Sequence, residues 1–316
     1  MRQSATAIEK SSQLSQGRVW GVLRGLVTTV RPTEWLKNTL VFAAIDFSGN
    51  LFSRSADIHA GMVFVTWCLA ASGAYFLNDL LDRKTDQTHP LKCFRPIASG
   101  LVSPTVAVLA LVALFGVGIA LGFSVNRGVG EMVLAYIVLT CAYSVWFKHV
   151  IILDVFVLAT GFVLRVIAGA EGIGVTFSSW LVLCTFLLAL FLGFGKRRHE
   201  LLLLDEAAMD HRRVLRDYSP HFLDMMMVVV TSATVVCYAL YTLDAATIAR
   251  FGTNRLVYTS VFVLYGIFRY LFLIYQKSAG GNPSAVLYKD LDLRIDIALW
   301  VASVLFLKYY PMQLGK

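Results

Sequence analysis

The stretch "GMVFVTWCLAASGAYFLNDLLDRKTD", residues 61–86, joins two unlike segments of sequence. Its first seventeen residues include no charged side chain, so a helix that they form can enter the hydrocarbon core of a bilayer. Its last nine residues, from Asn78 to Asp86, include three carboxylates and one amide. Charged groups at the edge of hydrocarbon cost free energy unless they are paired or reach water. The stretch therefore predicts a membrane helix that ends in a polar, functional site.

The composition of the whole chain indicates a membrane protein. Of its 316 residues, 57% are hydrophobic and 15% are charged, and the mean hydropathy is +0.67. Soluble domains usually carry about 25% charged residues. We therefore predict an all-α, polytopic membrane protein with about nine spanning helices. The predicted helices are residues 36–53, 57–81, 104–123, 130–147, 151–171, 177–195, 222–243, 256–276 and 294–311.

The chain shows no sign of a second domain. Residues 1–18 are polar and lack the apolar core of a signal peptide, so we expect a mobile tail. Residues 19–316 are predicted to form one transmembrane domain. Residues 18–35 mix apolar residues with three arginines, which is typical of a helix in the membrane interface. The five cysteines form no CxxC pair and four lie in apolar runs, so we expect buried free thiols that behave as small hydrophobic residues.

The distribution of Lys and Arg predicts the orientation. If the N-terminus lies inside, 20 of the 28 Lys and Arg residues lie in segments on the inner side and six on the outer side. This bias predicts an inner (plasma) membrane protein whose long polar loops face the cytoplasm. The net charge of +8 suits anionic lipid head groups or an anionic substrate. Nucleic acid is a poor alternative for loops held against a bilayer.

The carboxylates after the second predicted helix form the first candidate site. If that helix continues, Asn78, Asp82 and Asp86 share one face, and Asp79 lies beside them. Carboxylates held this close repel one another unless a cation neutralises them. Oxygen ligands favour Mg²⁺, which commonly bridges to substrate phosphates, so a diphosphate is the expected partner. The alternative is a solvated helix end whose carboxylates pair with the cations at positions 83 and 84.

Charge is expensive inside the bilayer, and Asp154, Arg165 and Arg269 lie deeper than the charges that gather at the inner face. Asp154 has functional and structural interpretations of equal weight. For Arg165 we favour a structural role, either reaching the outer interface or pairing with Glu171. We expect a structural role for Arg269 as well. His199 and His211 lack metal-ligand companions at useful spacing, and we expect both to be solvated.

The motif "NDLLDRKTD" resembles the NDxxDxxxD motif of the UbiA superfamily of intramembrane transferases. The segment "YSVWFKH", followed by Asp154, Arg165 and "AGA", is similar to that family's fourth and fifth helices. About nine helices also fit its fold, and the resemblance covers nearly the whole chain. It implies a UbiA-type bundle with an active site on the cytoplasmic side.

One branch of the superfamily is more similar than the rest. "RPTEWLKNTLVFAA", "KCFRPIASG" and "RRVLRDYS" resemble a branch whose donor is phosphoribosyl diphosphate. The second aspartate-rich motif of the aromatic prenyltransferases is replaced by "KRRHELLLLDEAAMD", residues 196–210. The resemblance implies Mg²⁺-dependent transfer of 5-phosphoribosyl to a polyprenyl (decaprenyl) phosphate, with pyrophosphate release and inversion at C1. The sequence leaves open whether the product feeds cell-wall arabinogalactan synthesis or another ribose-derived glycolipid. The alternatives are prenyl transfer to an aromatic acceptor and a lipid transporter without chemistry.

The resemblance also implies roles for individual residues. Asn78, Asp79, Asp82 and Asp86 would be catalytic and would hold Mg²⁺. A second set would surround the donor's phosphates and ribose: Lys37, Asn38, Lys92, Arg95, Lys148, Asp154, Lys196, Arg197, Glu200, Arg213 and Tyr218. The expected partners are phosphoribosyl diphosphate, polyprenyl phosphate and the lipid bilayer. Association into a homo-oligomer stays open, because aromatic residues such as Trp180 could face lipid or a neighbouring copy.

Overall fold

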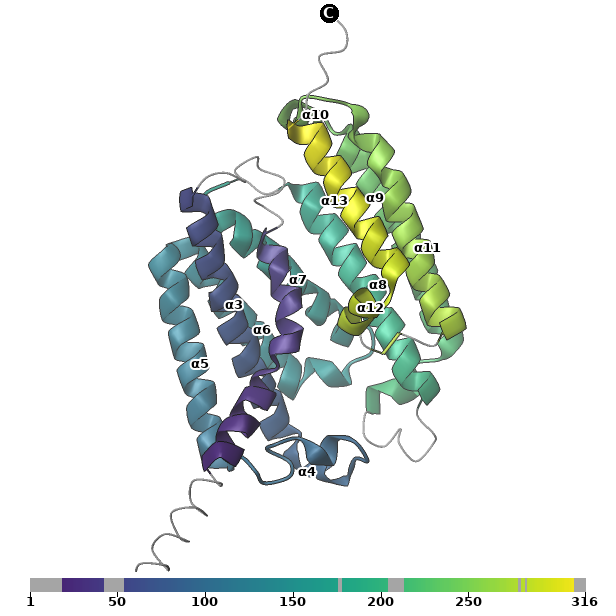
Figure 1. The fold of residues 1–316 in the computed structure, drawn as a ribbon. Helices are drawn as coiled ribbons and strands as arrows, with labels where there is room; N and C mark the ends of the chain where they lie inside the picture. Colours follow the sequence, from purple (N-terminus) through teal and green to yellow (C-terminus); the bar gives the residue numbers. More distant parts are fainter. Residues whose placement is uncertain are drawn as a thin grey trace, which may run out of the picture.

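The computed structural model describes residues 19–42, 54–175, 178–203, 213–277, 280–281 and 283–309. Within these ranges the regular structure is entirely helical. Two sets of helices lie side by side (Figure 1). The first set consists of η1 (Pro32–Phe42), α3 (Arg54–Leu81), α5 (Pro104–Val125), α6 (Arg127–Val145) and α7 (Leu153–Gly172). The second consists of α8 (Ser179–Leu203), α9 (Pro220–Leu243), α11 (Ser260–Lys277) and α13 (Leu291–Tyr309).

Short elements connect the long helices. These are α4 (Arg83–Thr88), η2 (Lys92–Phe94), η3 (Phe147–His149), η5 (Arg213–Asp217), α10 (Ala245–Phe251), η6 (Arg255–Thr259) and α12 (Pro283–Lys289). Residues 19–30 form one further helix, whose exposed face carries Trp20, Leu23 and Val27. That apolar face agrees with the predicted interfacial helix.

Seven helices of the described chain are long and apolar enough to cross a membrane: α3, α5, α6, α7, α8, α9 and the segment formed by η6 and α11. All seven were predicted from apolar runs. The predicted helix 36–53 differs, because its described part belongs to the 3-10 helix η1 and residues 43–53 lie outside the described ranges. The predicted helix 294–311 corresponds to α13, which carries Asp292, Arg294 and Asp296 and does not meet the same criteria of length and composition.

Each set of helices has an apolar core, and the core of the second set also includes Val155 and Ala159 of α7. Val41, Trp67 and Val133 are among the residues that pack in the first set, and Phe191 and Leu223 among those of the second. The two sets meet where α7 packs against α8. All five cysteines are free thiols, as predicted, but only Cys68 is buried and the other four are half-buried.

Local sequence explains where several helices begin. Ser103 caps α5 by accepting a hydrogen bond from the Val106 N–H, and Ser219 caps α9 in the same way. In both helices a proline follows the cap, at a position where its missing N–H leaves no hydrogen bond unmade. These caps place the polar loops that precede α5 and α9 at the ends of the bundle.

The packing of η1 on α7 depends on Gly169. A Cβ at this position would lie 2.0 Å from the carbonyl oxygen of Val41. No rotation of a side chain relieves a clash with backbone, so a larger residue must push η1 away from α7.

We expect Gly169→Ala to lower the free energy of unfolding by about 1–3 kcal/mol, the usual range for overpacking a core. Gly61→Ala is the matched control, because a Cβ at Gly61 meets nothing within 4 Å. Thermal unfolding in detergent measures both variants. Equal loss of stability in the two would contradict the clash at Gly169.

Candidate active site

The predicted carboxylates lie where α3 ends and α4 begins, at the lower end of the first set of helices in Figure 1. The regular helix is interrupted at Asp82, but the helical hydrogen bonds continue through it. The Asp82 N–H donates to the Asn78 carbonyl at 2.9 Å, and the Asp86 N–H donates to the Asp82 carbonyl at 2.8 Å. Residues four apart therefore lie on the same face here, as the sequence predicts for Asn78, Asp82 and Asp86.

Each of the three carboxylates forms an ion pair with a cation from another segment. Arg95 Nη1 donates to Asp79 Oδ1 at 3.0 Å and to Asp86 Oδ2 at 2.7 Å. Arg31 Nη2 also donates to Asp79 Oδ1, at 2.7 Å. Three separate parts of the chain thus meet around these two carboxylates.

Asp82 has its own partners. Lys148 Nζ donates to Asp82 Oδ1 at 2.6 Å, and Asn78 Nδ2 donates to Asp82 Oδ2 at 3.0 Å. In the described part of the chain, no ion pair joins the cluster to Arg83 or Lys84. The alternative of a helix end neutralised by these adjacent cations therefore does not describe the structure.

The carboxylates of this cluster are the type of ligand that a hard divalent cation prefers. The groups are carboxylate oxygens, and the oxygens of Asp79 and Asp86 already flank a single cationic nitrogen of Arg95. No three His, Cys, Asp or Glu side chains converge on one point within the described ranges. An ion that bound here would have to replace the nitrogen of Arg95 between the two oxygens.

A second polar cluster lies around Asp154, which is fully buried at the start of α7. Its carboxylate accepts hydrogen bonds from Arg197 Nε at 2.6 Å and from the Tyr218 hydroxyl at 2.8 Å. The remaining nitrogens of Arg197 donate to Glu200 at 2.8 Å and to the Tyr143 hydroxyl at 3.3 Å. Arg197 therefore ties α6, α7 and α8 together, in a position that is 1% exposed.

Tyr218 connects this cluster to the turn that precedes α7. Its hydroxyl accepts a hydrogen bond from the Ile152 N–H at 2.7 Å while donating to Asp154. Ile152 has a φ of 69°, a conformation that costs a β-branched residue free energy. Burial raises the pKa of Tyr218, so its hydroxyl keeps the proton that it donates. The same turn contains η3 and hence Lys148, the partner of Asp82.

We expect Tyr218→Phe to destabilise the protein by about 1.5–3 kcal/mol, because it removes a hydrogen bond to a buried charged group. Loss of the bond to Ile152 should also release the turn that carries Lys148. Tyr258→Phe is the control, because Tyr258 is exposed. Unfolding in detergent measures stability, and protease cleavage near residue 150 reports on the turn. Wild-type values for Tyr218→Phe would show that the hydroxyl does not hold the turn.

The other predicted binding residues are less closely grouped. Lys37 forms an ion pair with Glu34, and Lys196 lies 4.0 Å from Glu200. Lys92 lies in η2, three residues before Arg95. The side chain of Arg213 is outside what the structure describes, as is His211.

Asn38 is buried and contacts residues inside the bundle. Its amide donates to Cys68 Sγ and accepts from Arg165 Nε at 2.9 Å. Arg165 also donates to the Gly161 carbonyl and to the Tyr136 hydroxyl, so its described partners do not include Glu171. These contacts agree with the structural role expected of Arg165. Arg269 pairs with Asp290 and Asp292, which agrees with the structural role expected of it.

His199 and Arg31 lie in surroundings that differ from those expected from the sequence. His199, expected in solvent, is half-buried, and a Cβ at Gly281 would lie 2.4 Å from its ring. Arg31, which we expected only to lie in an interfacial helix, forms an ion pair with Asp79. The sequence does mark the position of Arg31, because Arg31 immediately precedes Pro32. In the structure one helix ends there and η1 begins.

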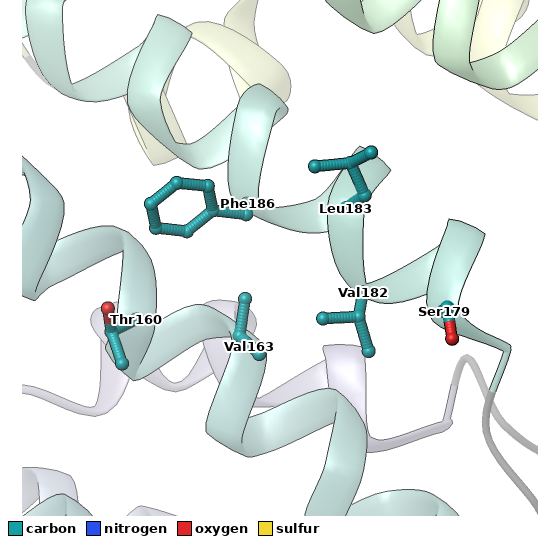
Figure 2. A pocket seen from close by; sticks show the side chains of 6 residues that line it. All are labelled: Thr160, Val163, Ser179, Val182, Leu183 and Phe186. Carbon is teal, nitrogen blue, oxygen red and sulfur yellow. The ribbon is translucent and has the colours of Figure 1, made fainter.

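An apolar pocket of about 230 Å³ opens between α7 and α8 (Figure 2). Val163 projects into it from α7, and Val182 and Phe186 from α8, as Figure 2 shows. Thr160, which also lines it, is six residues after Asp154, or about 9 Å further along the helix. The residues that line the pocket in the described chain include no carboxylate.

The model of the UbiA prenyltransferase family matches residues 39–289 of this chain. The chain belongs to the UbiA prenyltransferase family. This match confirms the resemblance to the UbiA family that the motif "NDLLDRKTD" indicates.

Relatives and solved structures of UbiA proteins extend this result. A decaprenyl-phosphate phosphoribosyltransferase from Corynebacterium glutamicum is 30% identical, and the match covers 96% of this chain and 92% of the relative. The protein of the same name from Mycolicibacterium smegmatis is 29% identical over 95% of this chain and 97% of its own. A UbiA homolog from Archaeoglobus fulgidus, solved with GPP and Mg²⁺ bound, has a TM-score of 0.70 and 18% identity. That match covers 90% of this chain and 99% of the homolog, and it shows the shared fold.

Proposed function

We propose that this UbiA family chain transfers the 5-phosphoribosyl group of phosphoribosyl diphosphate to a polyprenyl phosphate and releases pyrophosphate. The observation that carries the proposal is the group of three carboxylates whose ion pairs bring in Arg31, Arg95 and Lys148. Such a set offers both ligands for a metal and donors for phosphate oxygens. The proposal is also supported by the names of relatives that match this chain over nearly its full length.

The donor's diphosphate would bind at the junction of α3 and α4. Asp79, Asp82 and Asp86, with Asn78 beside them, would hold Mg²⁺, which when bound neutralises negative charge on the leaving pyrophosphate. Arg95 would donate N–H groups to phosphate oxygens, as a guanidinium does with two parallel hydrogen bonds. These groups stabilise charge where it develops as the C1–oxygen bond of the donor breaks.

The acceptor supplies its own nucleophile. A phosphate oxygen of the lipid, already anionic, forms the new bond to C1 from the face opposite the leaving group, so the configuration at C1 inverts. The electron pair of the broken bond leaves with pyrophosphate, and no proton has to be moved. A strong general base is therefore unnecessary, in agreement with the absence of a predicted catalytic His or Cys.

The polyprenyl tail requires an apolar surface that opens to lipid. The pocket between α7 and α8 is a surface of that kind, about two helical turns from Asp154 (Figure 2). We further propose an inner-membrane location with the carboxylates facing the cytoplasm. The Lys and Arg bias of the sequence supports this orientation, and a soluble sugar donor would reach the site from that side. Residues 19–316 would act as one domain preceded by a tail.

The decisive experiment supplies the purified protein with Mg²⁺, phosphoribosyl diphosphate and decaprenyl phosphate in detergent. We expect pyrophosphate release that requires the lipid, and a lipid product that carries phosphoribose. A parallel reaction contains geranyl diphosphate and an aromatic acid. Turnover confined to that reaction would replace the proposal with aromatic prenyl transfer, and no product in either would favour a lipid-binding protein without chemistry.

A further inference from the structure

Two strained residues adjoin the carboxylate cluster. In the part of the chain that the structure describes, only Arg31 and Ile152 are non-glycine residues with positive φ, at 55° and 69°. Arg31 donates to Asp79, and the turn at Ile152 carries Lys148, which donates to Asp82. Strained backbone persists only where its surroundings hold it, and it is concentrated at functional sites. Each strained residue therefore lies in a segment that also supplies a cation to the carboxylates.

The cations cover the carboxylates. The side chains of Asp79 and Asp86 are 2% and 4% exposed, whereas those of Arg31 and Arg95 are 28% and 26% exposed. A ligand that approaches from solvent therefore meets guanidinium groups before it meets these carboxylates. Arg31 also stacks on Tyr75, with its guanidinium carbon 4.7 Å from the ring centre. This contact can hold the guanidinium in place while its anionic partner changes.

The charges of the cluster balance, with three carboxylates paired to three cations. A metal ion that binds the carboxylates must displace the cations and leave them unpaired. A diphosphate that binds the cations must likewise leave the carboxylates unpaired. If both bind, each displaced group finds a new partner of opposite charge.

We propose that Arg31, Arg95 and Lys148 are exchangeable counter-ions, which move from the carboxylates to the donor's diphosphate as Mg²⁺ binds. Arg31 is thereby assigned as a further donor-binding residue. The inference rests on the proposed function, because it takes a diphosphate as the ligand. Mg²⁺ and diphosphate then bind with positive coupling, and each raises the affinity of the other by the same factor, of about 5–150-fold for typical coupled sites.

Calorimetric titration of the full chain in detergent tests the exchange. Mg²⁺ and pyrophosphate are each titrated alone and then in the presence of the other. We expect the affinity of each to rise at least about tenfold when the other is present, by equal factors. Equal affinities with and without the second ligand would overturn the proposal.

A variant distinguishes exchange from simple binding. Arg31→Gln removes a competitor for Asp79, so it should tighten the binding of Mg²⁺ alone while weakening that of pyrophosphate. Arg95→Gln should shift both affinities in the same directions, which guards against a local folding defect in either variant. Arg24→Gln, a change at an exposed arginine of the preceding helix, should alter neither affinity. Weaker binding of both ligands in Arg31→Gln and Arg95→Gln would contradict exchange.

The titrations also separate this inference from the proposed function. Positive coupling, with the expected opposite shifts in Arg31→Gln, in a protein that transfers no phosphoribosyl group to decaprenyl phosphate would support the exchange and contradict the proposed function. Transfer without coupling would support the function and overturn the exchange.

Discussion

Asp82→Asn is expected to slow phosphoribosyl transfer by about 10²–10³-fold, the usual loss when one group that stabilises developing charge is removed. The substitution keeps the shape of the side chain, and an amide oxygen can still accept a hydrogen bond from Lys148. It removes the negative charge that would hold Mg²⁺ against the leaving pyrophosphate. Asp82 is the best of the three carboxylates to test, because its side chain is 30% exposed and its loss should disturb folding least.

The measurement is pyrophosphate release at saturating donor and lipid. Asp57→Asn is the matched control, since Asp57 is an exposed aspartate in the first turn of the same helix, α3. We expect the control to retain wild-type turnover. Wild-type turnover in Asp82→Asn would remove Asp82 from the metal-binding set.

Arg197→Leu is expected to have the largest effect on stability, a loss of about 3–5 kcal/mol. Asp154 and Arg197 are almost completely buried, and their closest contact is 2.6 Å. Removing Arg197 leaves the carboxylate of Asp154 buried, with the Tyr218 hydroxyl as its one side-chain donor among the residues that the structure describes. An unpaired buried charge is far more expensive than the loss of the hydrogen bonds alone.

The double variant Asp154→Leu/Arg197→Leu tests this explanation. Replacing a whole buried ion pair by apolar residues is often close to neutral, so the double variant should recover much of the lost stability. Arg127→Gln breaks an exposed pair with Glu131 and should leave the unfolding temperature unchanged. Unfolding in detergent compares the four proteins. A double variant less stable than Arg197→Leu would show that the cost does not come from an unpaired charge.

Much of the fold could be predicted from the sequence. In hydrocarbon the backbone must satisfy its own hydrogen bonds, so an apolar run of sufficient length implies a helix. The seven spanning helices of the described chain follow this rule. η1 does not, because Pro32 and the charged pair Glu34 and Lys37 interrupt the apolar pattern. Its place is set by the close contact between Val41 and Gly169, which no local pattern reveals.

The candidate site, like the fold, could be predicted only in part from the sequence. The shared face of Asn78, Asp82 and Asp86 is a property of helical spacing and is visible in the letters alone. Four residues predicted to bind the donor form one hydrogen-bonded network in the structure: Asp154, Arg197, Glu200 and Tyr218. In this network the four residues contact one another. Whether the same residues also contact a substrate stays a prediction. Asn38 was predicted to bind the donor, and its described contacts are with Cys68 and Arg165.

Hydropathy and helical period are local properties, so the order of the residues is enough to predict a helical membrane protein with an acidic helix end. Which cations neutralise those carboxylates depends on tertiary packing. Arg31 is 48 residues from Asp79, and Lys148 is 66 residues from Asp82. Pairs so far apart depend on how whole helices pack, and the nearest charges in sequence, Arg83 and Lys84, do not form them.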